Sequence, residues 1–333
     1  MKEIAKKAGV SQATVSRVIN GHSSVTPDKR QKVMEWVRKL DYQPNLTAQS
    51  LVSNQSYLIG IVVPDISNPF FSEVVRVVES EADQHGYSVI ICNTEGNLQK
   101  ERNYINVLRS RQVDGILLVP SDATSSHLNS LKKANTPVVV ITQNLTGFDS
   151  VSLSHMHGGE QVAKHLLDLG HTNIVFVAGS KKDEKFIGFK RTLRQNGIIF
   201  NDDNFIECGG WQLNSREVYN KVKTYLSKKE NSDITALFAY NDLAAFGAMH
   251  AIQDLGLDIP KDIALIGFDN TFLSAETRPS LSTVAQPTGE MGRISLEILF
   301  KRITAKESEK GIEVILEPRL VVRESTRGID LDL

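Results

Sequence analysis

Cysteine is scarce in this sequence, with only two in 333 residues. Cys92 and Cys208 lie far apart and have no ligand-type neighbours, so we expect two reduced packing residues rather than a disulfide or a metal site. Long apolar runs are also absent, because stretches such as 58–63 and 116–119 are far too short to span a membrane. The N-terminus has no apolar signal-peptide core either. We therefore expect a cytoplasmic protein without a membrane segment.

The net charge of −1 is distributed unevenly along the chain. Residues 1–45 carry nine Lys or Arg and four Asp or Glu, so the remainder is acidic. A basic segment of this kind is typical of a module that binds phosphate groups, and a merely solvated helix face is the alternative. The chain has 41% hydrophobic and 23% charged residues, which is normal for a globular protein, and its length predicts two or three domains.

Residues 8–20, AGVSQATVSRVIN, predict a tight turn between two short helices. Gly9 suits the left-handed residue that ends the first helix, and Ser11 suits the N-cap of the second. In the second helix Val15, Val18 and Ile19 fall on one face. The other face carries Gln12, Ser16 and Asn20, with Ala13 and Arg17 beside them. This pattern is a helix-turn-helix, whose second helix enters the DNA major groove, and an ordinary helical hairpin is the alternative.

A third helix and a polar segment follow. The third helix is predicted to have Thr26 as its N-cap and Pro27 at its first position. Its apolar face is expected to comprise Val33, Trp36, Val37 and Leu40. Residues 42–56 have the composition of a linker, although 45–51 can form a short helix capped by Asn45. A helix that short is stable only against a partner.

From residue 58 onward, continuous apolar strands alternate with helices. One series of strands is predicted at 58–63, 87–91, 115–119 and 138–141, with helices at 71–85 and 101–109 between them. A second series follows at 173–178, 235–239 and 263–268. Two consecutive parallel-sheet units predict two α/β subdomains separated by a cleft, with ligands at the strand ends.

Short motifs spread over nearly the whole chain lie at 8–11, 14–20, 42–45, 62–71, 113–115, 170–171, 241–242 with Gly247, and 266–270. With these motifs in this order, the chain resembles the LacI/GalR family, the lactose and galactose repressor type of transcription regulators. The resemblance implies a helix-turn-helix head (1–44), a hinge helix (45–56), a body similar to type I periplasmic sugar-binding proteins (57–327) and a tail (328–333). That body has two doubly wound subdomains, and strands at 313–316 and 320–323 would complete sheets begun earlier.

The family's DNA-reading positions fall on the second helix and the hinge. The resemblance implies that Arg17 pairs with guanine, that Gln12 pairs with adenine and that Ala13 touches a thymine methyl group. The further expected DNA contacts are Thr14, Ser16, Asn20 and Asn45. Leu51 matches the leucine that hinge helices insert into the minor groove, whereas without the resemblance it is a loop leucine. Gln49 stands where an arginine is common.

The family's ligand positions fall at strand ends. The resemblance implies an effector site formed by Phe70, Phe71, Lys185, Trp211, Asn241 and Asp269. Aromatic rings, an amide and a carboxylate suit a polyol, although core packing for Phe70 and Phe71 and a turn role for Asp269 are the alternatives. Lys185 is nearest to a usual arginine and is expected in a short loop, 180–186. With Lys181 and Lys182 nearby, an acidic or phosphorylated sugar is an alternative effector.

Together with the basic helix-turn-helix, the resemblance implies a DNA-binding transcription regulator, most simply a repressor of carbohydrate-utilisation genes. It also implies a homodimer on near-palindromic operator DNA and a small sugar or sugar phosphate as effector. We expect no cofactor, metal or catalytic residue. The alternatives are a solute-binding protein for transport and a regulator of this family controlled by a protein corepressor. An enzyme is a third, since His155 and His157 suggest a metal site, but the sequence offers no third ligand at a recognisable spacing.

Overall fold

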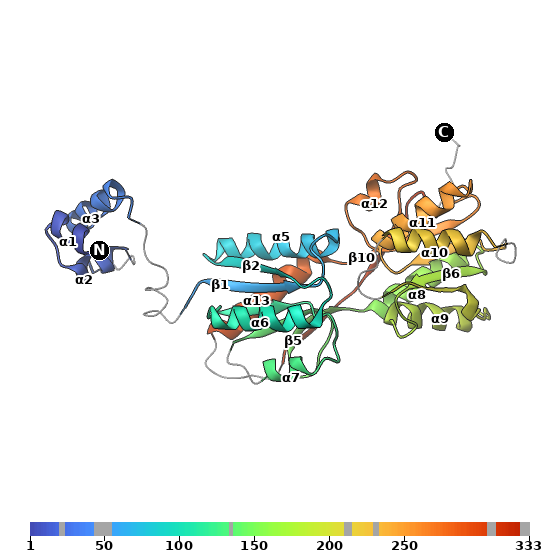
Figure 1. The fold of residues 1–333 in the computed structure, drawn as a ribbon, viewed down its shortest axis with the longest axis horizontal. Coiled ribbons are helices and arrows are strands. Elements are labelled where there is room, and N and C mark those ends of the chain that lie inside the picture. Colours follow the sequence, from blue (N-terminus) through green and yellow to red (C-terminus); the bar gives the residue numbers. More distant parts are fainter. Residues whose placement is uncertain are drawn as a thin grey trace. The chain divides into compact units, whose positions relative to one another are not determined.

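The computed structural model describes residues 1–19, 24–42, 55–132, 136–209, 215–228, 233–304 and 311–326. The chain divides into two compact units, Met1–Ser56 and Tyr57–Leu333, called here the head and the body (Figure 1). Several sequence-predicted positions lie outside the described residues: Asn20, Asn45, Gln49, Leu51 and Trp211, most of the predicted hinge, and the tail. Among the described residues, no helix combines the length and apolarity needed to cross a bilayer.

The head contains three helices around a small core. Helices α1 (Lys2–Ala8), α2 (Gln12–Ile19) and α3 (Pro27–Lys39) bury Ile4, Ala5, Val15, Val18 and Val33 against one another. The predicted turn between the first two helices is confirmed. Gly9 has a left-handed backbone with φ of 66°, and Ser11 Oγ accepts a hydrogen bond from the backbone N–H of Thr14 at 3.1 Å.

The predicted start of the third helix is confirmed, and its predicted end is not. Thr26 occupies the N-cap position and Pro27 the first turn, but the Thr26 side chain makes no capping hydrogen bond. Leu40 was expected on the apolar face, and this prediction is wrong. The helix ends before Leu40, whose backbone leaves helical geometry (φ −99°, ψ 6°), and its side chain is 36% exposed.

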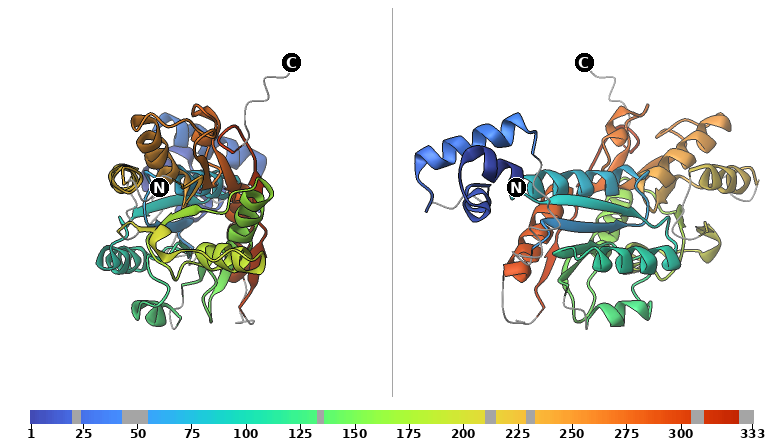
Figure 2. Two further views of the ribbon diagram at one scale, coloured as in Figure 1. Left: turned by 90° about the vertical axis from the view of Figure 1, so that its right-hand side faces the viewer. Right: turned by 60° about the vertical axis from the view of Figure 1, so that its left-hand side comes forward.

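One half of the body is built on a six-stranded parallel sheet, sheet A, with strand order β11-β5-β4-β3-β1-β2. Its strands are β1 (Leu58–Val63), β2 (Ser88–Asn93), β3 (Gly115–Leu118), β4 (Val138–Thr142), β5 (Asp149–Leu153) and β11 (Glu313–Leu316). Helices α5 (Pro69–Gln84) and α13 (Thr288–Thr304) cover one face, and α6 (Leu98–Ser110) and α7 (His127–Leu131) lie on the other (Figure 2).

The other half is built on sheet B, with strand order β12-β10-β9-β8-β6-β7. Its strands are β6 (Ile174–Ala178), β7 (Phe205–Glu207), β8 (Ala236–Ala239), β9 (Ala264–Asp269), β10 (Ser282–Ala285) and β12 (Arg319–Val321), of which only β12 is antiparallel to its neighbour. The flanking helices are α8 (His155–Asp168), α9 (Glu184–Gln195), α10 (Ser215–Leu226), α11 (Asp242–Asp254), the short α12 (Leu273–Glu276) and the 3-10 turn η1 (Asp202–Asn204).

The chain passes between the two halves three times. It leaves sheet A after β5, returns with α13 and β11, and adds β12 to sheet B. The predicted pair of parallel-sheet units, completed by two C-terminal strands, is therefore confirmed. Strands β5, β7 and β10 were missing from the prediction, which otherwise placed both ends of each body strand to within two residues. Cys92 and Cys208 are buried, free thiols.

Candidate DNA-reading helix and effector site

Helix α2 presents an exposed polar face opposite its buried side. Val15 and Val18 are enclosed by the head core, whereas the predicted base-reading side chains, Gln12, Ala13 and Arg17, are exposed. Thr14 and Ser16 are half-buried, and the Thr14 hydroxyl lies 2.9 Å from Ser11 Oγ. The core therefore fixes the rotation of α2 and leaves the three predicted reading residues available to a ligand.

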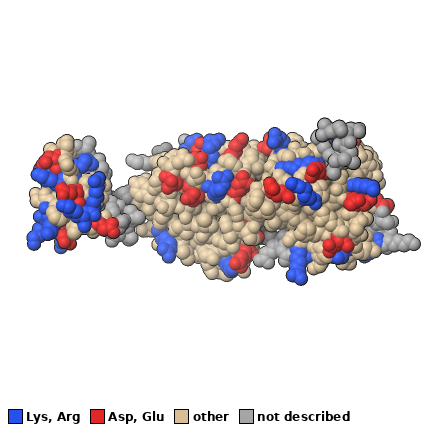
Figure 3. All heavy atoms as spheres, turned by 90° about the horizontal axis from the view of Figure 1, so that it is seen from above, with Lys and Arg blue, Asp and Glu red and all other residues tan. Residues whose placement is uncertain are grey.

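Basic side chains gather on the surface of the head. Figure 3 shows Lys and Arg over much of its visible face, with some Asp and Glu between them, and charges of both signs on the body. The ammonium groups of Lys39 and Lys7 lie 4.9 and 5.5 Å from the ring centroid of Trp36, so two of these charges are held against an aromatic surface. Such a surface attracts a polyanion such as the DNA backbone.

In the body, three neighbouring parallel strands of sheet B end in polar side chains: Asn241 after β8, Asp269 at the end of β9, and Gln286 after β10. Carboxyl ends of parallel strands share one edge of the sheet. Gln286 Nε2 donates to Asp269 Oδ1 at 2.6 Å, and among the described residues the buried Gln286 Oε1 has no hydrogen-bond partner. Gln286 was missed from the sequence because its strand, β10, was missed.

Lys185 joins this group from helix α9, and its predicted loop position is wrong. Asp183 caps α9, with its side chain accepting the Lys185 N–H at 2.8 Å, so Lys185 lies in the first turn of the helix. Its ammonium group is buried and donates to the carbonyl oxygen of Tyr240 at 3.1 Å. The same group lies 3.9 and 4.1 Å from the ring centroids of Tyr240 and Phe268.

Burial has the largest effect on the pKa values of Lys185 and Asp269. Desolvation lowers the pKa of Lys185, against the opposing effect of Asp183, Asp269 and Asp242. Desolvation raises the pKa of Asp269 to about 7, although Lys185 and the hydrogen bond from Gln286 act in the other direction. Asp269 also has a left-handed backbone with φ of 120°, which is strained for a residue with a side chain and is typical of functional positions.

The side-chain oxygen of Asn241 makes a structural hydrogen bond, and its amide N–H groups stay available to a ligand. Its Oδ1 caps α11 by accepting the N–H of Ala244 at 2.8 Å, while the described residues provide no acceptor for its amide N–H groups. The adjacent Asp242 is buried and structural, because Oδ2 accepts the N–H and hydroxyl of Thr271 at 2.7 and 3.0 Å. The site thus offers both donors and acceptors for hydroxyl groups.

Phe70 and Phe71 begin helix α5 at the carboxyl edge of sheet A. Phe70 is buried and Phe71 half-buried, with ring centroids 5.0 Å apart in an edge-to-face arrangement. Within the described residues, no hydrogen bond or ring contact joins Phe70 to Lys185, Asn241 or Asp269. The structure thus brings together the sheet B members of the predicted effector site, and the role of both phenylalanines there stays a prediction.

The two histidines that suggested a metal site have separate partners. His155 Nδ1 lies 4.0 Å from Glu184, whereas His157 Nδ1 lies 2.9 Å from Glu317. Burial, helped by the charge of Lys185, lowers the pKa of His155 to about 3. In the part of the chain that the structure describes, no group of three His, Cys, Asp or Glu residues is arranged to hold a metal ion.

Comparison with known proteins identifies both parts of the chain. Residues 1–45 match the family described as bacterial regulatory proteins, lacI family, and residues 163–326 match the periplasmic binding protein-like domain. The chain is 35% identical to the catabolite control protein A of Priestia megaterium over 98% of both chains. It belongs to the lacI family. It is also 36% identical to the transcriptional repressor PurR of Vibrio vulnificus over 99% of both chains.

Solved structures of the same family extend the comparison. The Lac repressor dimer bound to operator and an anti-inducer matches with a TM-score of 0.86 and 28% identity, over 97% of both chains. The regulator CelR in complex with cellobiose matches with a TM-score of 0.71 and 25% identity, over 97% of this chain and 98% of that one. The predicted family and the predicted combination of a helix-turn-helix head with a binding-protein-like body are confirmed.

Proposed function

We propose that this lacI-family member is a repressor of carbohydrate-utilisation genes that binds near-palindromic operator DNA as a homodimer and responds to a small sugar. The observation that carries the proposal is the exposed reading face of α2, Gln12, Ala13 and Arg17, held by a buried core in a basic head. Operator binding by the Lac repressor and sugar binding by CelR support it. The protein then works in the cytoplasm, where its DNA is.

The sheet B site supports a polyol effector rather than a reaction. Asn241, Gln286 and Asp269 supply donors and acceptors for hydroxyl groups, and Phe268 and Tyr240 form an apolar wall around the Lys185 ammonium group. A sugar bound there favours one relation of the two halves of the body over another and so changes operator affinity. The neutral polyol is favoured over a sugar phosphate, since the Lys185 ammonium group already donates to the Tyr240 carbonyl oxygen and nearby carboxylates offset its charge.

DNA binding is tested with the purified full chain. We expect it to prefer a duplex from upstream of its own gene over a random duplex of equal length, with affinity falling as salt rises. Fluorescence anisotropy at several potassium chloride concentrations measures both properties. Equal affinity for the two duplexes would contradict the proposed function.

The effector is tested separately by a thermal-shift screen of sugars and sugar phosphates. A ligand that binds the folded body raises its unfolding temperature by mass action. We expect Lys185→Met to abolish the shift given by the active sugar, and Lys182→Met, an exposed neighbour, to retain it. A screen in which no sugar acts would reject the sugar effector while leaving operator binding intact.

The dimer is supported by the Lac repressor match and by exposed apolar side chains on edge strand β2 of sheet A and on helix α6. Ile91 on edge strand β2 is 49% exposed, and Val107 on α6 is 44% exposed. We expect sedimentation to give twice the monomer mass, and Ile91→Glu to lower it toward the monomer. A monomeric wild-type chain would reject the dimer.

A further inference from the structure

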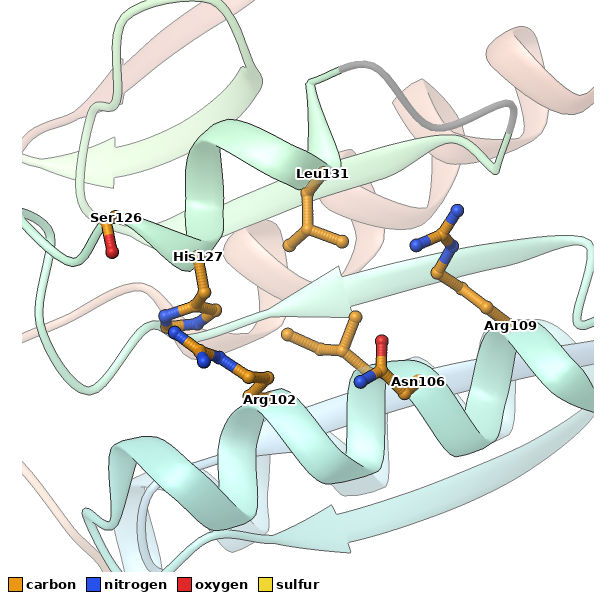
Figure 4. Close-up of a pocket in the computed structure, with 7 residues that line it drawn as sticks. Arg102, Asn106, Arg109, Ser126, His127 and Leu131 are labelled. Atoms are coloured by element: carbon orange, nitrogen blue, oxygen red, sulfur yellow. The ribbon is translucent and has the colours of Figure 1, made fainter.

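A pocket lies between helices α6 and α7, on the face of sheet A that these helices cover (Figure 4). Its volume is about 330 Å³, which is within the range of about 300–1,000 Å³ typical of small-molecule sites. It is lined by Arg102, Ile105, Asn106, Arg109, Ser126, His127 and Leu131. None of these residues belongs to the effector site on sheet B.

The lining residues of α6 form one stripe along the helix. Positions 102, 105, 106 and 109 follow a spacing of three, four and seven residues, which places them on one face. Arg102 and Arg109 occupy the ends of this stripe, with their α-carbons about 10 Å apart by helical rise. Figure 4 shows both arginine side chains, with Asn106 between them, extending from α6 toward α7. The buried Ile105 and Leu131 supply an apolar floor.

The two guanidinium groups are not used to stabilise the fold. Both arginines are exposed, and within the described residues neither forms an ion pair or a side-chain hydrogen bond. Two like charges that face a shared hollow attract an anion, and a guanidinium group binds carboxylate or phosphate through two parallel hydrogen bonds. Their separation suits a ligand with an anionic group at each end.

The wall of the pocket opposite Arg102 is rigidly built. His127 Nε2 lies 2.7 Å from Oε1 of the fully buried Glu101, and His127 Nδ1 lies 2.7 Å from Ser125 Oγ. The second carboxylate oxygen of Glu101 accepts the backbone N–H of Ser121 at 2.7 Å. A ligand that contacts His127 therefore contacts a fixed hydrogen-bond network rather than a mobile side chain.

The same network reaches the carboxyl edge of sheet A. Ser121 follows β3 and Thr94 follows β2, and their buried hydroxyl groups lie 3.3 Å apart. This is the edge from which Phe70 and the start of α5 also project. A ligand in the pocket between α6 and α7 is thus connected, through the hydrogen bonds of His127, Glu101 and Ser121, to the edge of sheet A where the family's ligand positions lie.

We infer that this pocket is a second regulatory site, which binds a small ligand with an anionic group, phosphate or carboxylate, at each end. Arg102 and Arg109 bind the two anionic groups, Asn106 and Ser126 bind polar atoms between them, and the middle of the ligand covers Ile105 and Leu131. The site does not depend on sugar binding or on operator recognition by the head.

The test uses the full chain and three probes at matched ionic strength: inorganic phosphate, inorganic triphosphate and adipate. Titration calorimetry is expected to give one triphosphate or adipate per chain and much weaker binding of single phosphate. Because each lost arginine removes charge-assisted hydrogen bonds, we expect Arg102→Gln and Arg109→Gln each to weaken binding about tenfold. Arg111→Gln, at the exposed C-cap of α6 and outside the pocket, is the control and should bind normally.

The outcomes distinguish binding in the pocket from a general attraction of anions to the surface. Equal affinities in all four proteins, or no binding to the wild type, would overturn the inference. Preference for triphosphate over adipate assigns the site to phosphorylated ligands, and the reverse assigns it to dicarboxylates. Hydrogen exchange should slow at the Ser121 amide when the probe binds the wild type but not Arg102→Gln, and an unchanged rate in the wild type would refute the connection to the sheet edge.

Discussion

Gly159 of α8 lies so close to the backbone of Lys185 on α9 that a β-carbon at position 159 would overlap the Lys185 carbonyl oxygen. The contact is reciprocal, because a β-carbon at Gly188 of α9 would overlap the carbonyl oxygen of Met156. The two helices therefore touch backbone to backbone. This contact places the first turn of α9, and with it the Lys185 ammonium group, beside the ends of the sheet B strands.

Gly159→Ala should accordingly damage both stability and the effector site. The added methyl group forces α8 and α9 apart, at a cost of about 1–3 kcal/mol in the free energy of unfolding, and displaces Lys185. Urea unfolding measures the first effect, and the response to the active sugar measures the second. Gly289→Ala, in the first turn of α13 with no atom near the new β-carbon, is the matched control and should be neutral or slightly stabilising. Equal behaviour of the two variants would contradict the close contact.

The position of Lys185 also shows which kind of feature could not be predicted from the sequence. The apolar strands could be predicted because each is a continuous run of buried apolar residues. The helix-turn-helix of the head could be predicted because the residues that form its turn are neighbours in the sequence. Burial of a lysine, however, depends on a helix contact between residues 26 positions apart, which no local pattern encodes. Strand β5 was missed for a related reason: it buries Asp149, Ser150 and Ser152, whose partners come from distant segments.

Asp149 is the clearest of these cases, and it supports a second prediction. Its carboxylate receives two hydrogen bonds from Arg302 of α13, at 2.7 and 2.8 Å, and one from the backbone N–H of Ile312 at 2.7 Å. The ion pair is almost buried. Arg302→Met leaves the carboxylate without its cation, so the body should lose about 3–5 kcal/mol of unfolding free energy.

A second arginine on the same helix provides the control. Arg293 pairs with Glu297, but both side chains are about half exposed, so Arg293→Met should cost about 0.5 kcal/mol or less. Chemical denaturation of both variants at pH 7 gives the comparison. Similar denaturation midpoints for the two variants would mean that the ion pair between Arg302 and Asp149 does not stabilise the fold.

His155 predicts a pH dependence of stability. Its pKa is about 3 in the folded chain, against an ordinary value of 6.5. Between these values the unfolded chain binds a proton that the folded chain does not, so this histidine lowers the free energy of unfolding as pH falls below about 6.5. The His155→Gln variant should therefore lose less stability than the wild type as pH falls, by up to about 1.4 kcal/mol for each pH unit. His157→Gln, which changes a half-exposed side chain, should leave the pH dependence in place.

Thermal unfolding of the three proteins at several values between pH 4 and pH 7 tests this. The difference in stability between wild type and His155→Gln should change steadily across that range and level off above it. A constant difference would mean that His155 titrates normally in the folded chain.

Arg17 provides the test of specificity, because a residue that reads a base and one that only contacts phosphate fail in different ways. Arg17→Ala should lose discrimination at one base pair of each half-site, at a cost of about 1–3 kcal/mol, and leave random DNA nearly unaffected. Lys2, exposed at the start of α1, should act through charge alone, so Lys2→Ala should weaken all sequences about equally and reduce the salt dependence. Anisotropy measurements on operator duplexes with single substitutions distinguish the two. A uniform loss from Arg17→Ala would mean that another face of α2 enters the groove.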